Sequence, residues 1–522
     1  MTPARHIDGV NPSTALRTGA RLLWERSASV LPVYLLASGL YGAARAPLVV
    51  AAVAAVWLLA AAGRLDPFLD RLRAAEGGPI DPGTGAGPGS GSLPPELGDA
   101  VAGLLTPGVV LLLVGGALGA AVLAVLASAV GNAAAVGGLV GLLRGDDGVR
   151  AAVTGVRRHW RAFVGVRLLL LAAIAVVLTP LFGLVAAVIG VTADAGGLTG
   201  VGALGIVAAV LGGLVTLLAV LVVLVLFAFA DQAVVVDDIG AVAGVKRSLR
   251  LPLQRPTAVL GYVAVAIGAV LVSAVVGSLA ATAGAPRAAA LAGTILVPPV
   301  VDGFKTALYA ETELPAESET APPIGTRLRM AFGGGLRSAG AFVRDHPLAT
   351  LASLGCFAAG GAVGWIAARS TGVNFPIGGD VGSVFGTVPV GTFVNLATNN
   401  WLVAVDLTYS GLAAGVPAVV TLVFNGLVVG AVGGVFDPVA FLALVAPHGI
   451  IEIPALVIGG AAGLSLGGVG IGALRGRYDD GDVAEAIRRT YRVLLGLVPL
   501  FVVAAFIEAF LTPAIASVVL GG

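Results

Sequence analysis

The sequence predicts an all-α, polytopic integral membrane protein with about eleven or twelve transmembrane helices. Of its 522 residues, 57% are hydrophobic and only 11% are charged, and the mean hydropathy is +1.00. The chain also contains many separate apolar runs of about 20 residues or more, the length that an α-helix needs to cross a bilayer. Such runs exclude a transmembrane β-barrel, because barrel strands alternate apolar and polar residues in short segments.

Composition also limits the possible partners and cofactors. The net charge is +1, whereas a nucleic-acid partner requires a basic surface, so we expect none. The four histidines and the single cysteine do not form a cluster with zinc spacing, and we expect no metal and no cofactor. The expected partners are the lipid bilayer and other membrane proteins.

The first 310 residues are predicted to form a helical membrane domain. A basic lead-in at residues 11–28 precedes an apolar stretch, Ser29–Ala62, which Arg45 and Pro47 interrupt, so it is one long tilted helix or a short hairpin. Residues 76–96 are rich in Gly, Pro and Ser and predict a flexible loop. Further apolar runs follow at Pro107–Leu143, Phe163–Val191, Val201–Ala230, Ala258–Ala283 and Ala288–Leu308.

A second break in hydropathy predicts a domain boundary. Residues 311–326 contain the acidic, proline-containing segment Glu311–Pro323, which favours a linker. Residues 327–522 then form a second membrane domain.

Three segments share one charge pattern. They begin at Asp146, Asp237 and Asp479, and each opens with paired aspartates and closes with paired bases. Acids at the start of a helix and bases at its end complement the helix dipole, which predicts short interfacial helices that each lead into the next membrane helix. Their arginines are interpreted as signals that hold these segments in the cytoplasm, and contacts with anionic lipid are the alternative.

The same rule predicts a cytoplasmic N-terminus and an external C-terminus. In the second half, simple apolar runs would place Arg475 outside, whereas its neighbouring arginines favour the inside. One more crossing, or a broken and partly re-entrant helix, is therefore required between Phe393 and Ala446. Gly415 with Pro417, and Asp437 with Pro438, mark the expected breaks.

The segment Ala446–Leu474 combines polar groups with an apolar run. His448 and Glu452 are four residues apart and share one helix face. The glycines that follow at intervals of four predict close helix packing; they are Gly459, Gly463 and Gly467. Ionisable residues inside membranes usually face a partner or a cavity, which defines a candidate intramembrane polar site of His448, Glu452, Glu508, Asn395, Asn399, Asn400, Asn425 and Asp406.

Each candidate also has a structural interpretation. His448 would be a polar residue at a helix start, or would form with Glu452 a proton-sensitive or cation-binding pair that packing brings beside Glu508. The asparagines of residues 395–400 would cap and cross-link helix ends, or bind a substrate. Asn425 with Gly426 would make a close helix contact with an interhelical hydrogen bond.

Four segments in the second domain carry a family resemblance. They are VNLATNNWLVAVDL from Val394, VFNGLVVGAV from Val423, PHGIIEIPALVIGGAAGLSLG from Pro447 and IEAFLTP from Ile507. In this order they resemble the stage II sporulation protein M family, over roughly Arg337–Gly522. The segment Ala233–Tyr262 is similar to uncharacterised prokaryotic membrane domains and to the membrane part of some glycerophosphodiester phosphodiesterases.

The resemblance implies a membrane scaffold that works with peptidoglycan-degrading partners and has no catalytic activity of its own. Fusion to a second membrane domain points to an assembly other than the sporulation one. The predicted function is therefore that of a non-catalytic scaffold or subunit of a complex in the cell membrane, not an enzyme. The alternative is a transporter or ion-binding membrane protein that uses the intramembrane Glu, His and Asn residues.

Overall fold

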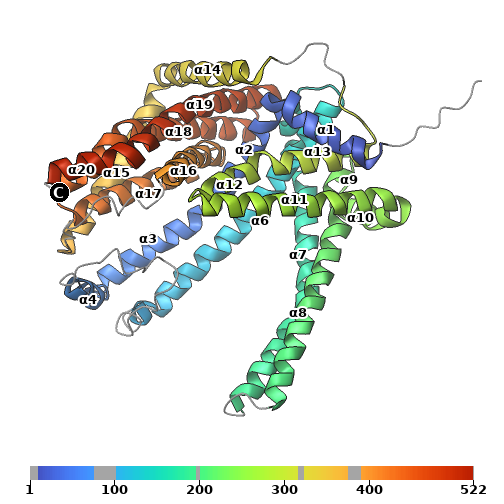
Figure 1. Cartoon of the computed structure of the whole chain (residues 1–522), viewed down its shortest axis with the longest axis horizontal. Helices are drawn as coiled ribbons and strands as arrows, with labels where there is room; N and C mark the ends of the chain where they lie inside the picture. Colours follow the sequence, from blue (N-terminus) through green and yellow to red (C-terminus); the bar gives the residue numbers. More distant parts are fainter. Residues whose placement is uncertain (1–9, 76–100, 195–199, 316–321, 374–388, 521–522) are drawn as a thin grey trace, which may run out of the picture. The chain divides into compact units, whose positions relative to one another are not determined.

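The computed structural model describes residues 10–75, 101–194, 200–315, 322–373 and 389–520, and nearly all of these residues are helical (Figure 1). The predicted Gly/Pro/Ser loop at 76–96 lies outside the described residues. The helices are α1 (Pro12–Glu25), α2 (Ser27–Ala43), α3 (Ala46–Ala61), α4 (Asp66–Ala75), α6 (Pro107–Leu143), α7 (Gly148–Asp194), α8 (Gly200–Phe227), α9 (Ala230–Val236), α10 (Ala241–Gln254), α11 (Pro256–Thr282), α12 (Pro286–Ile295), α13 (Val297–Ala310), α14 (Ile324–Asp345), α15 (Pro347–Ser370), α16 (Pro389–Ser410), α17 (Val416–Val435), α18 (Pro438–Leu474), α19 (Asp480–Phe506), the π-helical turn η2 (Ile507–Leu511) and α20 (Thr512–Leu520).

The predicted fold class is confirmed. Within the described residues, ten helices or runs of consecutive helices are long and apolar enough to cross a membrane. α16 is not among these ten. Its 22 residues are long enough to span a bilayer, and its hydropathy is lower because of the polar side chains along it. With α16 included the number among the described residues becomes eleven, and α16 lies where the arginine pattern predicts one more crossing.

The described residues form two compact units. The first comprises Met1–Leu31, Asn132–Leu271 and Pro298–Glu317, and the second comprises Pro32–Gly131, Val272–Val297 and Ser318–Gly522. Segments from the first 310 residues therefore contribute to both units. The break between α13 and α14 covers residues 311–323.

In the first unit, α7 and α8 run side by side as a pair of long helices (Figure 1). The 47 residues of α7 correspond to ~70 Å of helix, more than twice the hydrocarbon thickness of a bilayer. Its first part is basic and contributes the fully buried Phe163, whereas its second part exposes apolar side chains, including Val176 at 72%. The second part therefore has the surface expected of a lipid-facing helix.

A break between α8 and α9 is stabilised by one side chain. The Ser248 hydroxyl of α10 donates to the Leu226 carbonyl at 2.6 Å and accepts from the Phe229 amide at 3.2 Å. Phe229 is buried, and its ring packs edge-on against Tyr262 at 5.4 Å between centroids. Both of these backbone groups therefore have a hydrogen-bond partner despite the interruption. Backbone groups at membrane depth need such partners, because no water is available there.

The three paired-aspartate segments differ from the prediction of separate interfacial helices. Asp147 caps α7 by accepting from the Val149 and Arg150 amides, and Asp479 caps α19 with a reciprocal bond to Asp482. Both helices then continue without a break into apolar sequence. Only α10, the segment after Asp237, ends before the next membrane helix, where Arg255 precedes Pro256 and leaves the helical conformation.

In the second unit, glycines allow the backbones of α15 and α17 to touch. A Cβ on Gly360 would overlap the Val423 carbonyl, and one on Gly364 would overlap the Leu427 carbonyl. In return, Gly426 and Gly430 of α17 meet the backbone of α15. Small residues at intervals of four on both helices are the arrangement by which membrane helices pack closely.

The same principle places α18 against α16. Gly463 contacts the Leu407 carbonyl, and Gly467 lies against Gly415 at the turn after α16. Gly459 is more spacious, because a Cβ there would lie 3.4 Å from the Ala404 Cβ, an ordinary contact distance. The Thr408 hydroxyl donates to the Gly459 carbonyl at 3.0 Å, so this interface also includes a hydrogen bond.

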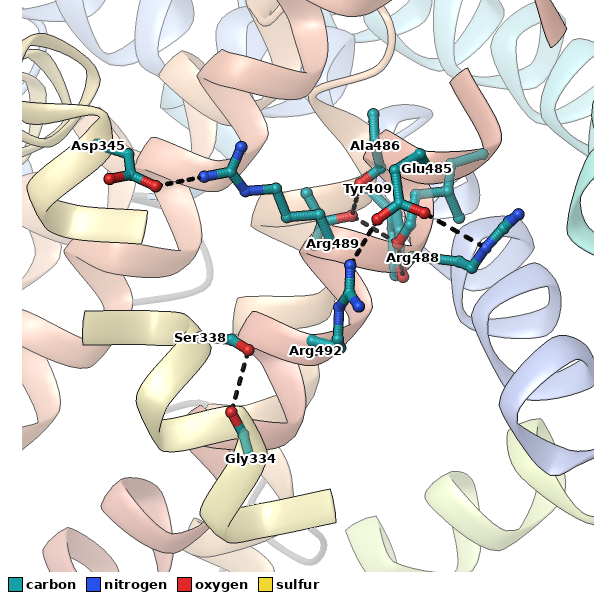
Figure 2. A network of polar contacts seen from close by, with 11 residues as sticks. Gly334, Ser338, Asp345, Tyr409, Glu485, Ala486, Arg488, Arg489 and Arg492 are labelled. Atoms are coloured by element: carbon teal, nitrogen blue, oxygen red, sulfur yellow. Dashed lines mark hydrogen bonds and ion pairs between the residues drawn. The ribbon is translucent and has the colours of Figure 1, made fainter. Parts of the chain in front are cut away.

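α14 lies along α19 (Figure 1), where Gly335 and Gly496 bring the two backbones into contact. Figure 2 shows Asp345, at the end of α14, facing Arg489 of α19, and the two side chains form an ion pair at 2.7 Å. Glu485 contacts Arg492 at 2.5 Å and Arg488 at 3.7 Å. These charges on the first turns of α19 therefore form the polar end of this helix pair.

Both breaks expected after Phe393 are present. Gly415 adopts a left-handed conformation (φ 77°) and precedes α17, while the Asp437 side chain caps α18 by accepting from the Val439 and Ala440 amides. Ser29–Ala62 is also divided, because α2 ends and α3 begins on either side of Arg45.

Replacing Gly426 with alanine is expected to destabilise the protein, since the new methyl group would overlap the Phe357 carbonyl of α15. We expect a loss of about 1–3 kcal/mol, the usual cost of overpacking, measured by unfolding in mixed detergent. Gly355→Ala on α15 is the matched control, because a Cβ there meets nothing within 4 Å. Equal stability of the two variants would contradict the packing of α15 on α17.

Candidate functional site

Three of the candidate residues converge in the second unit. His448 and Glu452 lie one turn apart on α18, and Glu508 lies on η2. The ligand atoms that these side chains offer all lie within 4.8 Å of one another. We call these three residues the triad.

The triad is largely enclosed. The His448 and Glu508 side chains are 13% and 20% exposed, and their facing atoms, His448 Nε2 and Glu508 Oε1, are 3.9 Å apart. That separation is too long for a hydrogen bond. His448 Nδ1 and Glu452 Oε2 are buried and have no hydrogen-bond partner among the described residues. The site therefore contains polar atoms whose bonding capacity is not met by the surrounding side chains.

The helix that carries His448 and Glu452 is weakened on both sides of them. Pro447 and Pro454 lie inside α18, and proline has no amide hydrogen to donate to the carbonyl four residues earlier. α18 begins at Pro438, so His448 lies well inside the helix. The structural interpretation had placed His448 at a helix start, and the structure differs from it in this respect. Asp437 provides the N-cap of α18, ten residues before Pro447, and the helix is continuous through His448.

Glu508 owes its position to a π-helical turn. In η2 the Thr512 amide and hydroxyl both donate to the Ile507 carbonyl, the hydroxyl at 3.1 Å. Pro513 follows and has no amide hydrogen for the Ala509 carbonyl, so a regular α-helical bond is excluded there. Single π-turns inside α-helices are found frequently at functional sites.

An aromatic cluster fixes η2 against α16. Phe393 of α16 packs on Phe506 and Phe510, with centroid distances of 6.3 and 6.0 Å. Phe506 and Phe510 flank Glu508 in sequence and lie 5.0 Å from each other. The turn that presents Glu508 is therefore held by apolar contacts to a neighbouring helix.

The asparagines of α16 make structural contacts. The Asn395 carboxamide oxygen accepts from the Arg287 amide at 2.9 Å and so caps the first turn of α12. Asn399 donates to Asn400 at 3.2 Å. The Asn395 bond corresponds to the capping and cross-linking role considered for this group, whereas the bond between Asn399 and Asn400 stays within α16.

Two further candidates have partners elsewhere. Asp406 lies 3.5 Å from Arg45, a residue 361 positions away that sequence spacing does not connect to it. Asn425 donates to the Thr421 carbonyl of its own helix at 2.8 Å, so the interhelical hydrogen bond expected for it is not formed. Gly426 alone makes the close helix contact at this position.

Sequence reasoning missed a buried ion pair in the first unit. Arg167 of α7 pairs with Asp231 of α9, and their side chains are 19% and 13% exposed. The neighbouring Gln232 is fully buried, and neither of its side-chain polar atoms has a partner among the described residues. Arg167 lies in one apolar run and Asp231 directly follows another. An ionisable residue at such a position usually has a charged partner, so this position could have predicted the pair.

Contact between His448 and Glu508 predicts that their substitutions are not additive. For His448→Gln combined with Glu508→Gln, we expect a coupling of about 0.5–3 kcal/mol, because residues that share one site influence each other's surroundings. Unfolding of the single and double variants in mixed detergent measures it. The control cycle pairs His448→Gln with Glu485→Gln, ~35 Å along the helix from Glu508. Additive effects in both cycles would contradict the convergence.

Comparison with known proteins gives two family matches. Residues 13–312 match a family described as "Domain of unknown function (DUF7847)", and residues 353–513 match "Stage II sporulation protein M". An uncharacterised protein of Methanocaldococcus jannaschii is 32% identical over 133 residues, which are 24% of this chain and 75% of that protein. No solved structure matches the chain. The chain therefore belongs to the DUF7847 family through its N-terminal region and to the stage II sporulation protein M family through its C-terminal region.

Proposed function

We propose that the protein is a non-catalytic subunit or scaffold of a complex in the cell membrane. The observation that supports this most directly is the short connections of the second unit. α16 and α17 are joined by residues 411–415, α17 and α18 by residues 436–437, and α18 and α19 by residues 475–479. Such connections hold no soluble catalytic domain. Three of the helices that they join pack through glycine on another helix of the unit, α17 on α15, α18 on α16 and α19 on α14.

The polar groups between these helices mostly serve assembly. The Ser353 hydroxyl donates to the Val457 carbonyl at 2.8 Å and links α15 to α18. The Trp401 indole donates to the Leu494 carbonyl at 2.9 Å and links α16 to α19. Both side chains are buried. A rigid helix group of this kind suits a platform that holds partner proteins.

The alternative function, transport or ion binding, is supported by a different observation, the convergence of the triad. Its first requirement is that these three side chains bind an ion. The two functions are compatible, since a membrane subunit can also hold an ion.

A subunit role predicts partners in fixed proportion. Native membranes that contain the full chain should be extracted in mild detergent and examined by native mass spectrometry. We expect the 51.3 kDa chain together with at least one other membrane protein at a constant ratio. The same sample after denaturation supplies the mass of the chain alone. A homogeneous single chain under mild extraction would contradict the proposal.

The orientation that we propose has the N-terminus in the cytoplasm and the C-terminus outside. With α2 and α3 counted as one crossing and α16 as another, the basic segments near residues 150, 250, 335 and 485 fall on the cytoplasmic side, as the positive-inside rule favours. Arg64, Arg71 and Arg73 fall outside, where Asp66 and Asp70 lie beside them in sequence. The loop after α3 is then external, and the loop after α18 is cytoplasmic.

Cysteine labelling tests this orientation. In a Cys356→Ala background, which removes the single native cysteine, a membrane-impermeant maleimide should label Arg64→Cys in intact cells. Arg477→Cys should be labelled only after the membrane is permeabilised. The native side chains at both positions are exposed, so a difference in labelling would reflect the side of the membrane and not burial within the protein. The reverse pattern would invert the proposed topology.

A further inference from the structure

We infer that His448, Glu452 and Glu508 form a binding site for one divalent transition-metal ion. The three side chains come from α18 and η2, and their ligand atoms lie within 4.8 Å of one another. An imidazole and two carboxylates are all metal ligands, and three of them from the protein are the number found in open zinc sites.

The spacing in the triad is consistent with a shared ion. Metal–nitrogen and metal–oxygen bonds are about 2.0–2.2 Å, so two ligand atoms on one tetrahedral ion lie about 3.3–3.6 Å apart. His448 Nε2 and Glu508 Oε1 are separated by 3.9 Å, too far to bond to each other and slightly farther than two ligands of one ion. The three ligand atoms all lie within 4.8 Å of one another, so the side chains must move closer together for all three to hold one ion.

The unmet bonding capacity of the triad also indicates a ligand. Glu452 Oε2 is buried without a partner among the described residues, and a buried acceptor without a partner is destabilising. The other side chains around it do not relieve this cost. Coordination to an ion would provide the missing partner.

Charge determines the valence of the ion. Two carboxylates and a neutral imidazole carry a charge of −2 when they act as ligands, because metal ligands are deprotonated. At membrane depth an uncompensated charge is costly, so a divalent cation, which makes the site neutral, is favoured over a monovalent one.

Ligand type determines the class of the ion. Mg²⁺ and Ca²⁺ take oxygen ligands, with Mg²⁺ retaining several waters. An imidazole with carboxylates suits Zn²⁺, Mn²⁺ or Fe²⁺. The ligands come from helix segments that lack regular backbone bonds, at Pro447 in α18 and at η2. These segments can adjust the ligand positions as an ion enters, and the fourth coordination position stays open to water or a further ligand.

Metal analysis of the full-length protein tests the site. The chain, purified in detergent without a histidine tag, should be equilibrated with Zn²⁺ or Mn²⁺ and washed, and its metal content should be measured by mass spectrometry. We expect about one ion per chain, and a loss of affinity of at least about 10-fold in His448→Gln, Glu452→Gln and Glu508→Gln. Glu485→Gln, a carboxylate variant on the first turns of α19, should retain the ion.

X-ray absorption of the loaded protein gives a second readout that does not depend on variants. We expect nitrogen and oxygen neighbours only, with an imidazole contribution. The inference is overturned if the native chain holds no more than trace metal, if the triad variants retain the ion as Glu485→Gln does, or if the spectrum lacks imidazole. Those results would leave the subunit proposal intact, because it rests on the short connections of the second unit and is tested separately by partner stoichiometry.

Discussion

Close backbone contact through glycine is the constraint on which the second unit depends. Without a hydrophobic drive for pairing in lipid, helices associate through van der Waals contact and interhelical hydrogen bonds, and both require short distances. Gly426 and Gly430 bring α17 onto α15, while Gly463 and Gly467 bring α18 onto α16. The position of α18 fixes His448 and Glu452, so glycine contacts determine where two of the three triad residues lie, whereas Glu508 depends on η2 and its aromatic contacts.

Several buried polar side chains in this unit link neighbouring helices. Ser353, Trp401 and Thr408 are buried and each donates to a backbone carbonyl of a neighbouring helix. These bonds hold neighbouring helices together, and each of the three donors has an acceptor. The triad differs, since Glu452 retains a buried oxygen without a partner among the described residues. The buried Ser410 hydroxyl also has no partner among the described residues, but the unpartnered oxygen of Glu452 belongs to a group of three ligand side chains whose ligand atoms lie within 4.8 Å of one another.

The sequence was sufficient to predict the all-helical membrane fold, because hydropathy and run length follow directly from composition. It also indicated that His448 and Glu452 share a face, since their spacing of four is local. The position of Glu508 was not predictable in the same way, because it depends on the π-turn η2 and on Phe393, which lies more than 100 residues earlier. The partner of Asp406 was missed for a similar reason, as Arg45 lies in another part of the chain. The prediction of separate interfacial helices was wrong for α7 and α19. The charge pattern marked the start of each helix correctly, but no residue after the charged segment ends the helix there.

Stability alone does not explain the triad. Each ionisable residue in a membrane helix costs about 2.5–3.5 kcal/mol on insertion scales, and well-packed apolar residues in place of a buried polar cluster are often neutral or stabilising. The surrounding helices already have glycine contacts and hydrogen bonds that hold them together. The two prolines of α18 and the π-turn also remove regular backbone bonds next to the triad, which lowers local stability further. A site that is destabilising in its side chains and in its backbone is best explained by a ligand, because binding would satisfy the unpaired oxygen and join η2 to α18. Such an ion would make the packing of η2 and α20 on α18 depend on ligand occupancy, which would connect the proposed metal site to the proposed role as a membrane subunit.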